Sequence, residues 1–318
     1  MSGTTEHAPI RPFTIEIPEA ELEALRARIA ATRWPERETV ADESQGVQLA
    51  TMQELVRYWG TEYDFRRFEA RLNALPQFIT EIDGLDIHFI HVRSPHENAL
   101  PLIITHGWPG AKAPTELIGI HSNMPGTVPA AVAKALASNV LGAGTPPSDL
   151  SADEQRAYDR LNFLYTTGIG YALEMGNRPQ TLYGLADSPV ALAAWMLDHD
   201  AYSYEDIASA FRGEPVGNLT RDEVLDNITL TWVTNTGVSS GRLYWENTLD
   251  FFDAKGVTVP AAVSVFPREL YQAPRSWTEQ AYPNLAYFNE VGKGNHFAAW
   301  QEPNLFTTEV RAAFRSLR

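Results

Sequence analysis

Residues 100–110 read Leu100-Pro-Leu-Ile-Ile-Thr-His-Gly-Trp-Pro-Gly110, and this stretch decides the fold class. Its first six residues are almost wholly apolar, as in a strand buried on both faces of a mostly parallel sheet. The Gly- and Pro-rich turn after them exposes backbone N–H groups at the strand's end. Two more strand patterns, over 261–266 and 285–291, lie near the C-terminus. The sequence therefore predicts an α/β fold.

The segments before this strand predict helices and then a hairpin. Apolar residues recur at helical spacing over 18–30 and again over 52–72. Residues 78–83 and 85–92 alternate apolar with polar side chains around Asp83-Gly84, which is typical of a β-hairpin. A further short strand is expected over 117–121, after the Gly-rich turn.

The centre of the chain, from 128 to about 252, is predicted to be mainly helical. Ser151 begins a capping box, Ser188 precedes Pro189 at a helix start, and Thr220 begins another helix. Thr308 is expected to cap a closing helix over 308–318. A helical block that interrupts a sheet domain suggests a lid over the carboxyl ends of the strands. The predicted domains are an N-terminal helical arm (1–76), a core (77–126 and 259–318) and a lid (127–258).

Composition limits the classes of function. The formal net charge is −15, which makes a nucleic-acid partner unexpected, because such surfaces need clustered Lys and Arg. The absence of cysteine excludes disulfides and thiolate catalysis. No apolar run approaches the ~18 residues of a membrane span. We expect a soluble, cytoplasmic protein; a homodimer is compatible with the sequence.

Two residues near the C-terminus are candidates for acid–base chemistry. Glu269 and His296 each follow a predicted strand, so the two side chains can meet at one sheet edge. The carboxylate would then orient the imidazole, which would serve as a general base. A surface carboxylate and a structural histidine would give the same pattern. His88 and His91 lie on a hairpin strand, and no partner is obvious for His7, His96, His121 and His199; no metal-ligand spacing occurs.

A nucleophile is harder to find. The tight strand–turn–helix elbow of hydrolases has small residues two before and two after the nucleophile. Gly237-Val-Ser239-Ser-Gly241 is one literal match, but the residues before it favour a helix over a strand. Ser239 would make the protein a serine esterase. No Asp occupies an elbow pattern.

Ten stretches form a set that spans nearly the whole chain. They are Arg11-Pro-Phe-Thr-Ile-Glu-Ile-Pro, Arg33-Trp-Pro, Leu72-Asn-Ala-Leu-Pro-Gln-Phe, His106-Gly-Trp-Pro-Gly, Ile120-His-Ser-Asn-Met-Pro, Arg178-Pro-Gln-Thr, Asp187-Ser-Pro-Val-Ala-Leu-Ala-Ala-Trp, Arg242-Leu-Tyr-Trp-Glu-Asn, Phe266-Pro-Arg-Glu and His296-Phe-Ala-Ala-Trp. In this order they resemble the microsomal-type epoxide hydrolases, which have an α/β-hydrolase fold and an N-terminal helical arm, and the resemblance is specific as a set.

The resemblance implies hydrolysis of a small apolar epoxide to a vicinal diol without a cofactor or metal, a detoxification type of chemistry. Glu269 and His296 look like the charge-relay pair that activates water. Tyr171 and Tyr244 look like the lid tyrosines that hydrogen-bond the epoxide oxygen. The backbone N–H of Trp108 looks like an oxyanion donor. Asn295 departs from the Gly that the family usually has before the His.

The larger departure follows Gly110. The family there has further strands and helices and an elbow of the type Gly-Gly-Asp-Trp-Gly, whose Asp forms a covalent ester with the substrate. At roughly 30 residues for each strand–helix unit, two or more units are absent from this sequence. The core is therefore expected without its central strands, and the nucleophile stays unknown. A catalytically inactive deletion form and a protein that binds apolar ligands are the alternatives.

Overall fold

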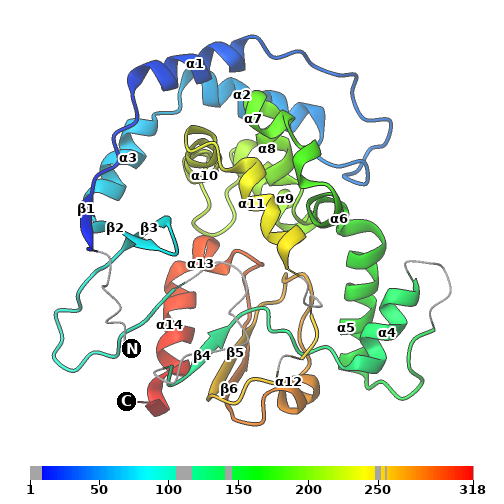
Figure 1. Ribbon diagram of the computed structural model, residues 1–318. Helices are drawn as coiled ribbons and strands as arrows, with labels where there is room; N and C mark the ends of the chain where they lie inside the picture. Colours follow the sequence, from blue (N-terminus) through cyan, green and yellow to red (C-terminus); the bar gives the residue numbers. More distant parts are fainter. Residues whose placement is uncertain (1–8, 105–116, 140–144, 248–251, 255, 318) are drawn as a thin grey trace.

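The computed structural model describes residues 9–104, 117–139, 145–247, 252–254 and 256–317. Helices from the first quarter of the chain form an outer layer, and helices from its centre lie beneath them (Figure 1). A parallel sheet with its covering helices lies below both, at the end of the molecule where the C-terminus is found (Figure 1). This arrangement of arm, lid and sheet confirms the predicted α/β fold.

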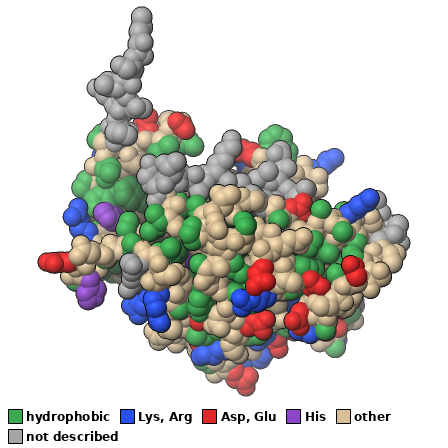
Figure 2. Space-filling view, turned by 90° about the horizontal axis from the view of Figure 1, so that it is seen from below, with side chains coloured by type: hydrophobic (Ala, Val, Ile, Leu, Met, Phe, Trp, Pro, Cys, Tyr) green, Lys and Arg blue, Asp and Glu red, His purple; other side chains and the backbone are tan. Residues whose placement is uncertain are grey.

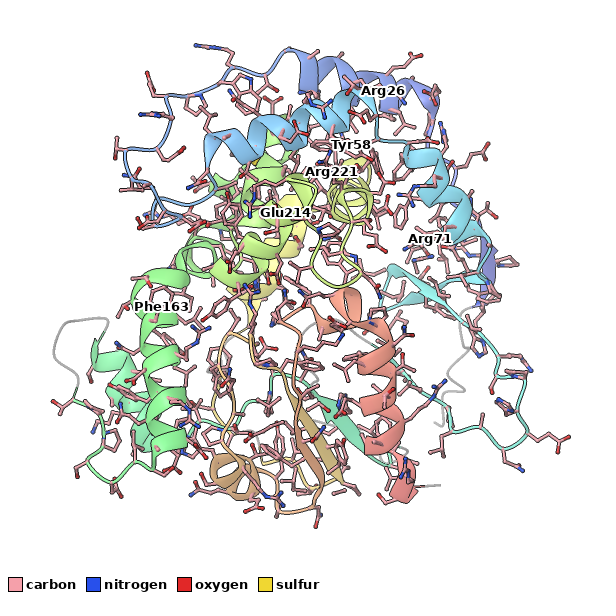
Figure 3. The ribbon with its side chains drawn as sticks, turned by 180° about the vertical axis from the view of Figure 1, so that it is seen from behind. Arg26, Tyr58, Arg71, Phe163, Glu214 and Arg221 are labelled. Carbon is pink, nitrogen blue, oxygen red and sulfur yellow. The ribbon has the colours of Figure 1, made fainter. Side chains whose placement is uncertain are left out.

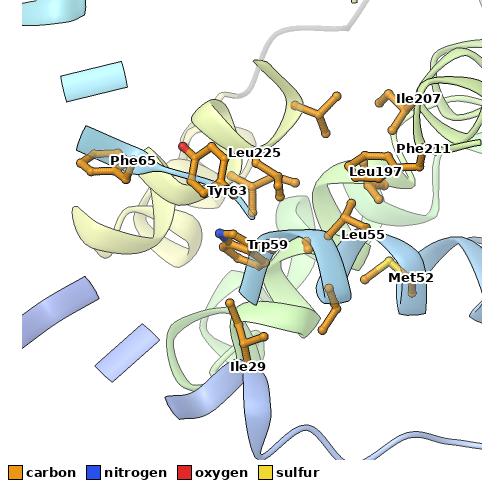
Figure 4. Packing of buried hydrophobic residues seen from close by; sticks show 14 of the residues in the cluster. Ile29, Met52, Leu55, Trp59, Tyr63, Phe65, Leu197, Ile207, Phe211 and Leu225 are labelled. Carbon is orange, nitrogen blue, oxygen red and sulfur yellow. The ribbon is translucent and has the colours of Figure 1, made fainter. Parts of the chain in front are cut away.

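The arm consists of α1 (Glu19–Ala30), α2 (Leu49–Thr61) and α3 (Phe65–Asn73). The single helix predicted over 52–72 is two helices, because the Asp64 side chain accepts a hydrogen bond from the Arg66 N–H and caps the start of α3. The buried faces of α1 and α2 lie against the lid. Apolar residues of both parts interleave there, among them Leu55, Trp59 and Leu225 (Figure 4).

Polar contacts reinforce the packing of arm on lid. The indole N–H of Trp59 donates to Thr229 Oγ1 at 2.9 Å in the buried interface. The Tyr58 hydroxyl donates to Asp222 Oδ1 at 2.8 Å, and the Arg221 guanidinium lies 5.4 Å from the Tyr58 ring centre (Figure 3). Buried donors with partners and a large apolar contact together hold the two helical layers as one core.

The lid is almost wholly helical. Its helix starts agree with the capping patterns in the sequence: Ser151 and Thr220 form capping boxes, and Ser188 caps the helix that begins at Pro189. The elements are α4 (Ala130–Asn139), α5 (Ala152–Phe163), the π-helix η1 (Leu164–Gly168), α6 (Gly170–Asn177), the 3₁₀ helix η2 (Pro179–Thr181), α7 (Gly184–Asp187), α8 (Pro189–Leu197), α9 (Ala201–Phe211), α10 (Arg221–Val233) and α11 (Gly237–Glu246).

The predicted hairpin is present. Strands β2 (Gln77–Ile82) and β3 (Leu85–Ile90) pair antiparallel, and β1 (Arg11–Phe13) of the N-terminal segment adds to β2. Asp83 and Gly84 both have positive φ, 52° and 81°, as a two-residue type I′ turn requires. These three strands form a sheet of their own, separate from the parallel sheet.

The strand predicted over 100–105 is wrong for the part that the structure describes. Residues 101–104 pair with no strand, and the Ile103 side chain is 86% exposed. A strand forms only where neighbouring backbones offer hydrogen-bond partners. Neither sheet of the described residues includes this segment, so its apolar side chains are left exposed.

The parallel sheet contains β4 (Ile120–Ser122), β5 (Ala261–Val265) and β6 (Leu285–Glu290), in the order β4-β5-β6. Every residue of the central strand β5 is buried. The covering helices are α12 (Arg275–Ala281) and α14 (Pro303–Ala313); the short α13 (Ala298–Gln301) and η3 (Arg315–Leu317) lie before and after α14.

The helix start predicted at Thr308 is wrong. Helix α14 begins at Pro303, whose fixed φ suits the first turn, and Thr308 lies in its interior. There the Thr308 hydroxyl donates to the Asn304 carbonyl. Threonine occurs both as a helix cap and in helix interiors, where its hydroxyl bonds to the preceding turn, and the sequence does not distinguish the two cases.

One buried carboxylate joins the lid to the sheet domain. Asp206, on α9, is 1% exposed and accepts hydrogen bonds from Arg268 Nη1, Asn295 Nδ2 and Gln301 Nε2 at 2.8, 2.8 and 2.7 Å. Burial raises the pKa of Asp206, although these three donors act against that rise. Because Arg268 and Asn295 come from the loops after β5 and β6 and Gln301 ends α13, Asp206 fixes the lid relative to both loops.

The surface mixes charged and apolar side chains. On the face seen from below, acidic, basic and hydrophobic groups lie among one another over most of the described surface (Figure 2). None of the helices in the described ranges combines the length and the apolar character that crossing a membrane requires.

Replacing Asp206 by Ala should lower the free energy of unfolding by about 1–3 kcal/mol, because the buried amide groups of Asn295 and Gln301 would lose their acceptor. Denaturant titration followed by circular dichroism measures this change. The neighbouring Glu205 is the matched control, since it pairs with the same arginine at 2.5 Å but is 59% exposed. Glu205→Ala should cost about 1 kcal/mol or less. Equal losses from the two substitutions would contradict the role given to Asp206.

Candidate active site

The two parallel strands β5 and β6 end side by side, and a candidate residue follows each. Glu269 comes four residues after β5, and His296 comes six residues after β6. A parallel bridge pairs Arg268 with Asn295, and the Arg268 N–H donates to the Gly294 carbonyl at 3.1 Å. The strand ends and this bridge therefore place both side chains at one edge of the sheet, where open α/β sheets bind ligands.

Glu269 and His296 are in direct contact. Nδ1 of His296 lies 2.6 Å from Oε1 of Glu269, a carboxylate that is wholly buried. Oε1 also accepts from the Leu270 N–H at 2.8 Å, and Oε2 accepts from Asn123 Nδ2 at 3.1 Å. A carboxylate held at both oxygens fixes the Nδ1–H tautomer of the imidazole and leaves Nε2 for a proton transfer.

The electrostatic surroundings of His296 favour its protonated form. Burial of the ring alone would lower its pKa. The charge of Glu269, the hydrogen bond to it and the charge of Asp200 outweigh burial, so the pKa of His296 is raised above its ordinary value. A raised pKa makes the imidazole a stronger base toward a water molecule at Nε2.

A second imidazole lies against the first. The ring of His199 stacks on His296 with centres 4.7 Å apart and planes 24° apart. Its Nδ1 lies 2.9 Å from Oδ2 of Asp200. No partner for His199 is apparent from the sequence, so its place beside His296 is not predicted. The sequence around His199 indicates only that Asp200 can cap the following helix, and a cap does not predict a stacked pair of imidazoles.

The two lid tyrosines come from different helices, and their rings are in contact. Tyr171 on α6 and Tyr244 on α11 have ring centres 6.1 Å apart and planes 87° apart. Tyr171 also lies 5.2 Å from the His199 ring. Burial raises the pKa of both phenols. They therefore keep their protons at neutral pH and can donate hydrogen bonds to an oxygen atom.

A glycine lets these two helices approach. A Cβ at Gly241 of α11 would lie 3.2 Å from Cγ of Met175 on α6, closer than most carbon contacts. Gly241, which is part of the elbow-like pattern around Ser239, therefore allows close packing of α11 on α6.

The serine candidate is wrong. Ser239 lies inside α11, its hydroxyl donates to the Thr236 carbonyl, and the segment before it is α10 rather than a strand. An elbow needs a strand to aim its nucleophile at the site. Trp108 and the rest of His106-Gly-Trp-Pro-Gly lie outside the residues that the structure describes.

Asn295, which departs from the family pattern, has a structural role. Its Nδ2 donates to Asp206, its Oδ1 accepts from the Phe297 N–H at 2.9 Å, and its own N–H donates to Gln301 Oε1. These bonds anchor the loop that carries His296 to the lid.

These residues define a class of protein: a hydrolase of the α/β-hydrolase fold in which a His–carboxylate pair faces two tyrosines of a helical lid. The comparisons with known proteins give the particular family. The model of the epoxide hydrolase N terminus matches residues 10–113. A protein assigned as an epoxide hydrolase in Stigmatella aurantiaca (strain DW4/3-1) is 41% identical, with 97% of this chain and 86% of that protein covered. The chain belongs to the epoxide hydrolase family.

More distant relatives agree with this assignment. Epoxide hydrolase 1 of Sus scrofa is 27% identical, with 97% of this chain and 89% of that protein covered. The Aspergillus niger epoxide hydrolase structure matches with a TM-score of 0.73 at 24% identity, over 98% of this chain and 97% of that one. Juvenile hormone epoxide hydrolase of Bombyx mori matches with a TM-score of 0.77 at 22% identity, over 98% and 96%. The two structures share the fold.

The alignment with the Stigmatella protein extends over 381 positions, whereas this chain has 318 residues. The relative therefore has at least about 60 residues without a counterpart here, which is the length of two strand–helix units. The place of these residues after Gly110 stays a prediction.

Replacing Glu269 by Gln should lower the pKa of His296, because the negative charge that outweighs burial is removed while an oxygen acceptor for Nδ1–H remains. NMR titration of the His296 ring protons measures this pKa. Glu279→Gln, at an exposed position of α12 that pairs with Arg275, is the control and should leave the titration unchanged. A His296 pKa that stays the same or rises in Glu269→Gln would show that the carboxylate does not stabilise the imidazolium.

Proposed function

We propose that Tyr171, Tyr244, His296 and Glu269 form a site that hydrolyses a small epoxide to a vicinal diol. The observation that carries the proposal is a row of ring contacts between the lid and the sheet edge: Tyr244 lies against Tyr171, Tyr171 against His199, and His199 against the carboxylate-held imidazole of His296. Epoxide opening needs a base for the incoming oxygen and a donor for the departing one, and these residues supply both.

The tyrosines are the electrophilic half of the site. As the epoxide C–O bond breaks, negative charge develops on its oxygen, and hydrogen bonds placed at that atom stabilise the transition state. Since burial keeps both phenols protonated, either can donate to this oxygen and one can transfer its proton to the alkoxide. Their edge-to-face ring contact, with centres 6.1 Å apart, keeps the two phenols side by side.

His296 is the basic half. Its Nε2 takes a proton from a water molecule, and Glu269 stabilises the imidazolium that results. The water oxygen attacks an epoxide carbon, the C–O bond of the three-membered ring breaks, and the alkoxide receives a proton from a tyrosine. The proton on His296 then returns to the tyrosinate through solvent, so that the site regains its starting state.

This route differs from the ester route that the resemblance implies. The ester route requires an Asp in an elbow turn, and the sequence has none. Ser239 is held in a helix and cannot replace it. We therefore assign the attack on the epoxide to the water that His296 activates.

The proposed substrate is apolar and uncharged. The rings of Tyr171, Phe297, His199 and His296 form a continuous group of aromatic contacts at the site. Aromatic walls with a few fixed donors favour an apolar small molecule held by one polar atom. A nucleic acid does not suit a chain of net charge −15.

Tyr171→Phe and Tyr244→Phe should each lower kcat/KM for an aryl epoxide by about 100-fold, because each removes one donor to the developing alkoxide. The double substitution should cost less than the product of the two, since the phenols act as a pair. Diol formation followed by chromatography measures these rates. Tyr183→Phe is the control, because Tyr183 is 65% exposed on the surface.

Two results would contradict the proposal. If the tyrosine variants hydrolyse the epoxide at the unsubstituted rate, the phenols do not take part. If the protein binds the epoxide without forming diol, the site binds apolar ligands and is not catalytic.

A further inference from the structure

His199 occupies a central place that the reaction outlined above does not use. Its ring lies 4.7 Å from His296, 5.2 Å from Tyr171 and 5.2 Å from Phe297. It therefore contacts the base, one of the donors and a wall of the site. A residue in contact with all three controls their relative positions.

The contact with His296 is a stack rather than an edge contact. The 24° between the planes brings one face of the His296 imidazole against the face of His199. Phe297 meets the same imidazole edge-on at 4.8 Å and 80°. The Glu269 hydrogen bond fixes one atom of the ring but allows rotation about the line through Nδ1. A stacked ring opposes that rotation, because turning the imidazole would separate the two faces.

His199 is itself held firmly. Oδ2 of Asp200 is hydrogen-bonded to Nδ1 of His199. Oδ1 of Asp200 accepts a hydrogen bond from the Ser203 N–H at 2.9 Å, so that Asp200 is also the N-cap of α9. The Asp200 side chain is 6% exposed. Burial alone would raise the pKa of Asp200, but the bond to His199 and the helix cap outweigh it and the pKa is lowered. A charged, doubly bonded carboxylate cannot turn away from His199 without losing the cap.

We propose that His199, held by Asp200, is a positioning residue for His296: its ring stacks on the imidazole and keeps Nε2 directed at the water and the epoxide. The site thus contains two imidazole–carboxylate pairs, Glu269–His296 from the sheet and Asp200–His199 from the lid. The inference rests on the proposed function for its effect on rate, but its effect on the ring of His296 requires no turnover.

The stack also links the lid to the charge of the base. The titratable groups that face the two rings are the carboxyls of Glu269, Asp200 and Asp198 and the phenol of Tyr171. Asp200 belongs to the lid and raises the pKa of His296. Any movement that separates the lid from the sheet edge should remove both the stacking ring and part of the charge that favours the imidazolium.

Three variants of the full chain separate these effects. His199→Ala removes the ring, and His199→Phe keeps an aromatic face while removing the bond to Asp200. Asp200→Asn removes the charge, and asparagine is as good an N-cap as aspartate, so α9 keeps its start. His96→Ala, at an exposed histidine of a loop, is the control.

The first readout is NMR of the ligand-free protein. In His199→Ala the Nδ1–H signal of His296 should broaden, because the ring is less restrained and its proton exchanges with water. In His199→Phe the signal should stay sharp. In Asp200→Asn the pKa of His296 should fall, since one of the charges that raise it is gone.

The second readout is turnover. His199→Ala should lower kcat by about tenfold with little change in KM. The loss is smaller than the roughly 100-fold or more that a general base contributes, because His296 itself remains. His199→Phe should recover most of that loss. The proposal is overturned if His199→Ala leaves both the His296 signal and kcat unchanged. It is also overturned if His199→Phe is as defective as His199→Ala in both measurements.

Absence of turnover in every protein, including the unsubstituted chain, would count against the proposed function. The NMR signals would still decide the role of His199.

Discussion

The buried carboxylate of Asp206 is the contact on which the site depends. It lies on a lid helix, yet all three of its donors belong to the sheet domain, in or near the loops that follow β5 and β6. Those loops carry Glu269 and His296. A charge so deeply buried is stable only with every donor in place. The lid, the loops and the catalytic pair are therefore positioned together, and a lid displaced from the sheet would leave Asp206 and Arg268 unsatisfied.

Acidic side chains organise the site at three levels. Asp206 joins lid to sheet, Glu269 orients the base from the sheet, and Asp200 orients the stacked ring from the lid. Each is nearly or wholly buried and each accepts more than one hydrogen bond. Fixed acceptors of this kind hold the donors without rearranging during a reaction, which is how protein sites stabilise charge better than water does.

Much of this could be predicted from local patterns. Capping residues placed helix starts at Ser151, Ser188 and Thr220, and a hairpin follows from Asp83-Gly84 because both residues accept positive φ. The contact between Glu269 and His296 could be predicted because each residue follows a strand of the parallel sheet. Three features could not be predicted. The strand over 100–105 looked buried by composition, but burial depends on neighbours that this chain lacks. Thr308 has the chemistry of a cap in the interior of a helix. His199 acquires its role only through contacts with residues far along the chain.

A single turnover in H₂¹⁸O tests the central claim most directly. Protein in excess is mixed with an epoxide in labelled water, and the masses of the diol and of the protein are measured after the first turnover. If the water activated by His296 attacks the epoxide, the diol contains one ¹⁸O and the protein mass is unchanged. An unlabelled diol, with ¹⁸O found in a carboxylate of the protein or with a covalent adduct on it, would contradict the account and reveal an ester intermediate.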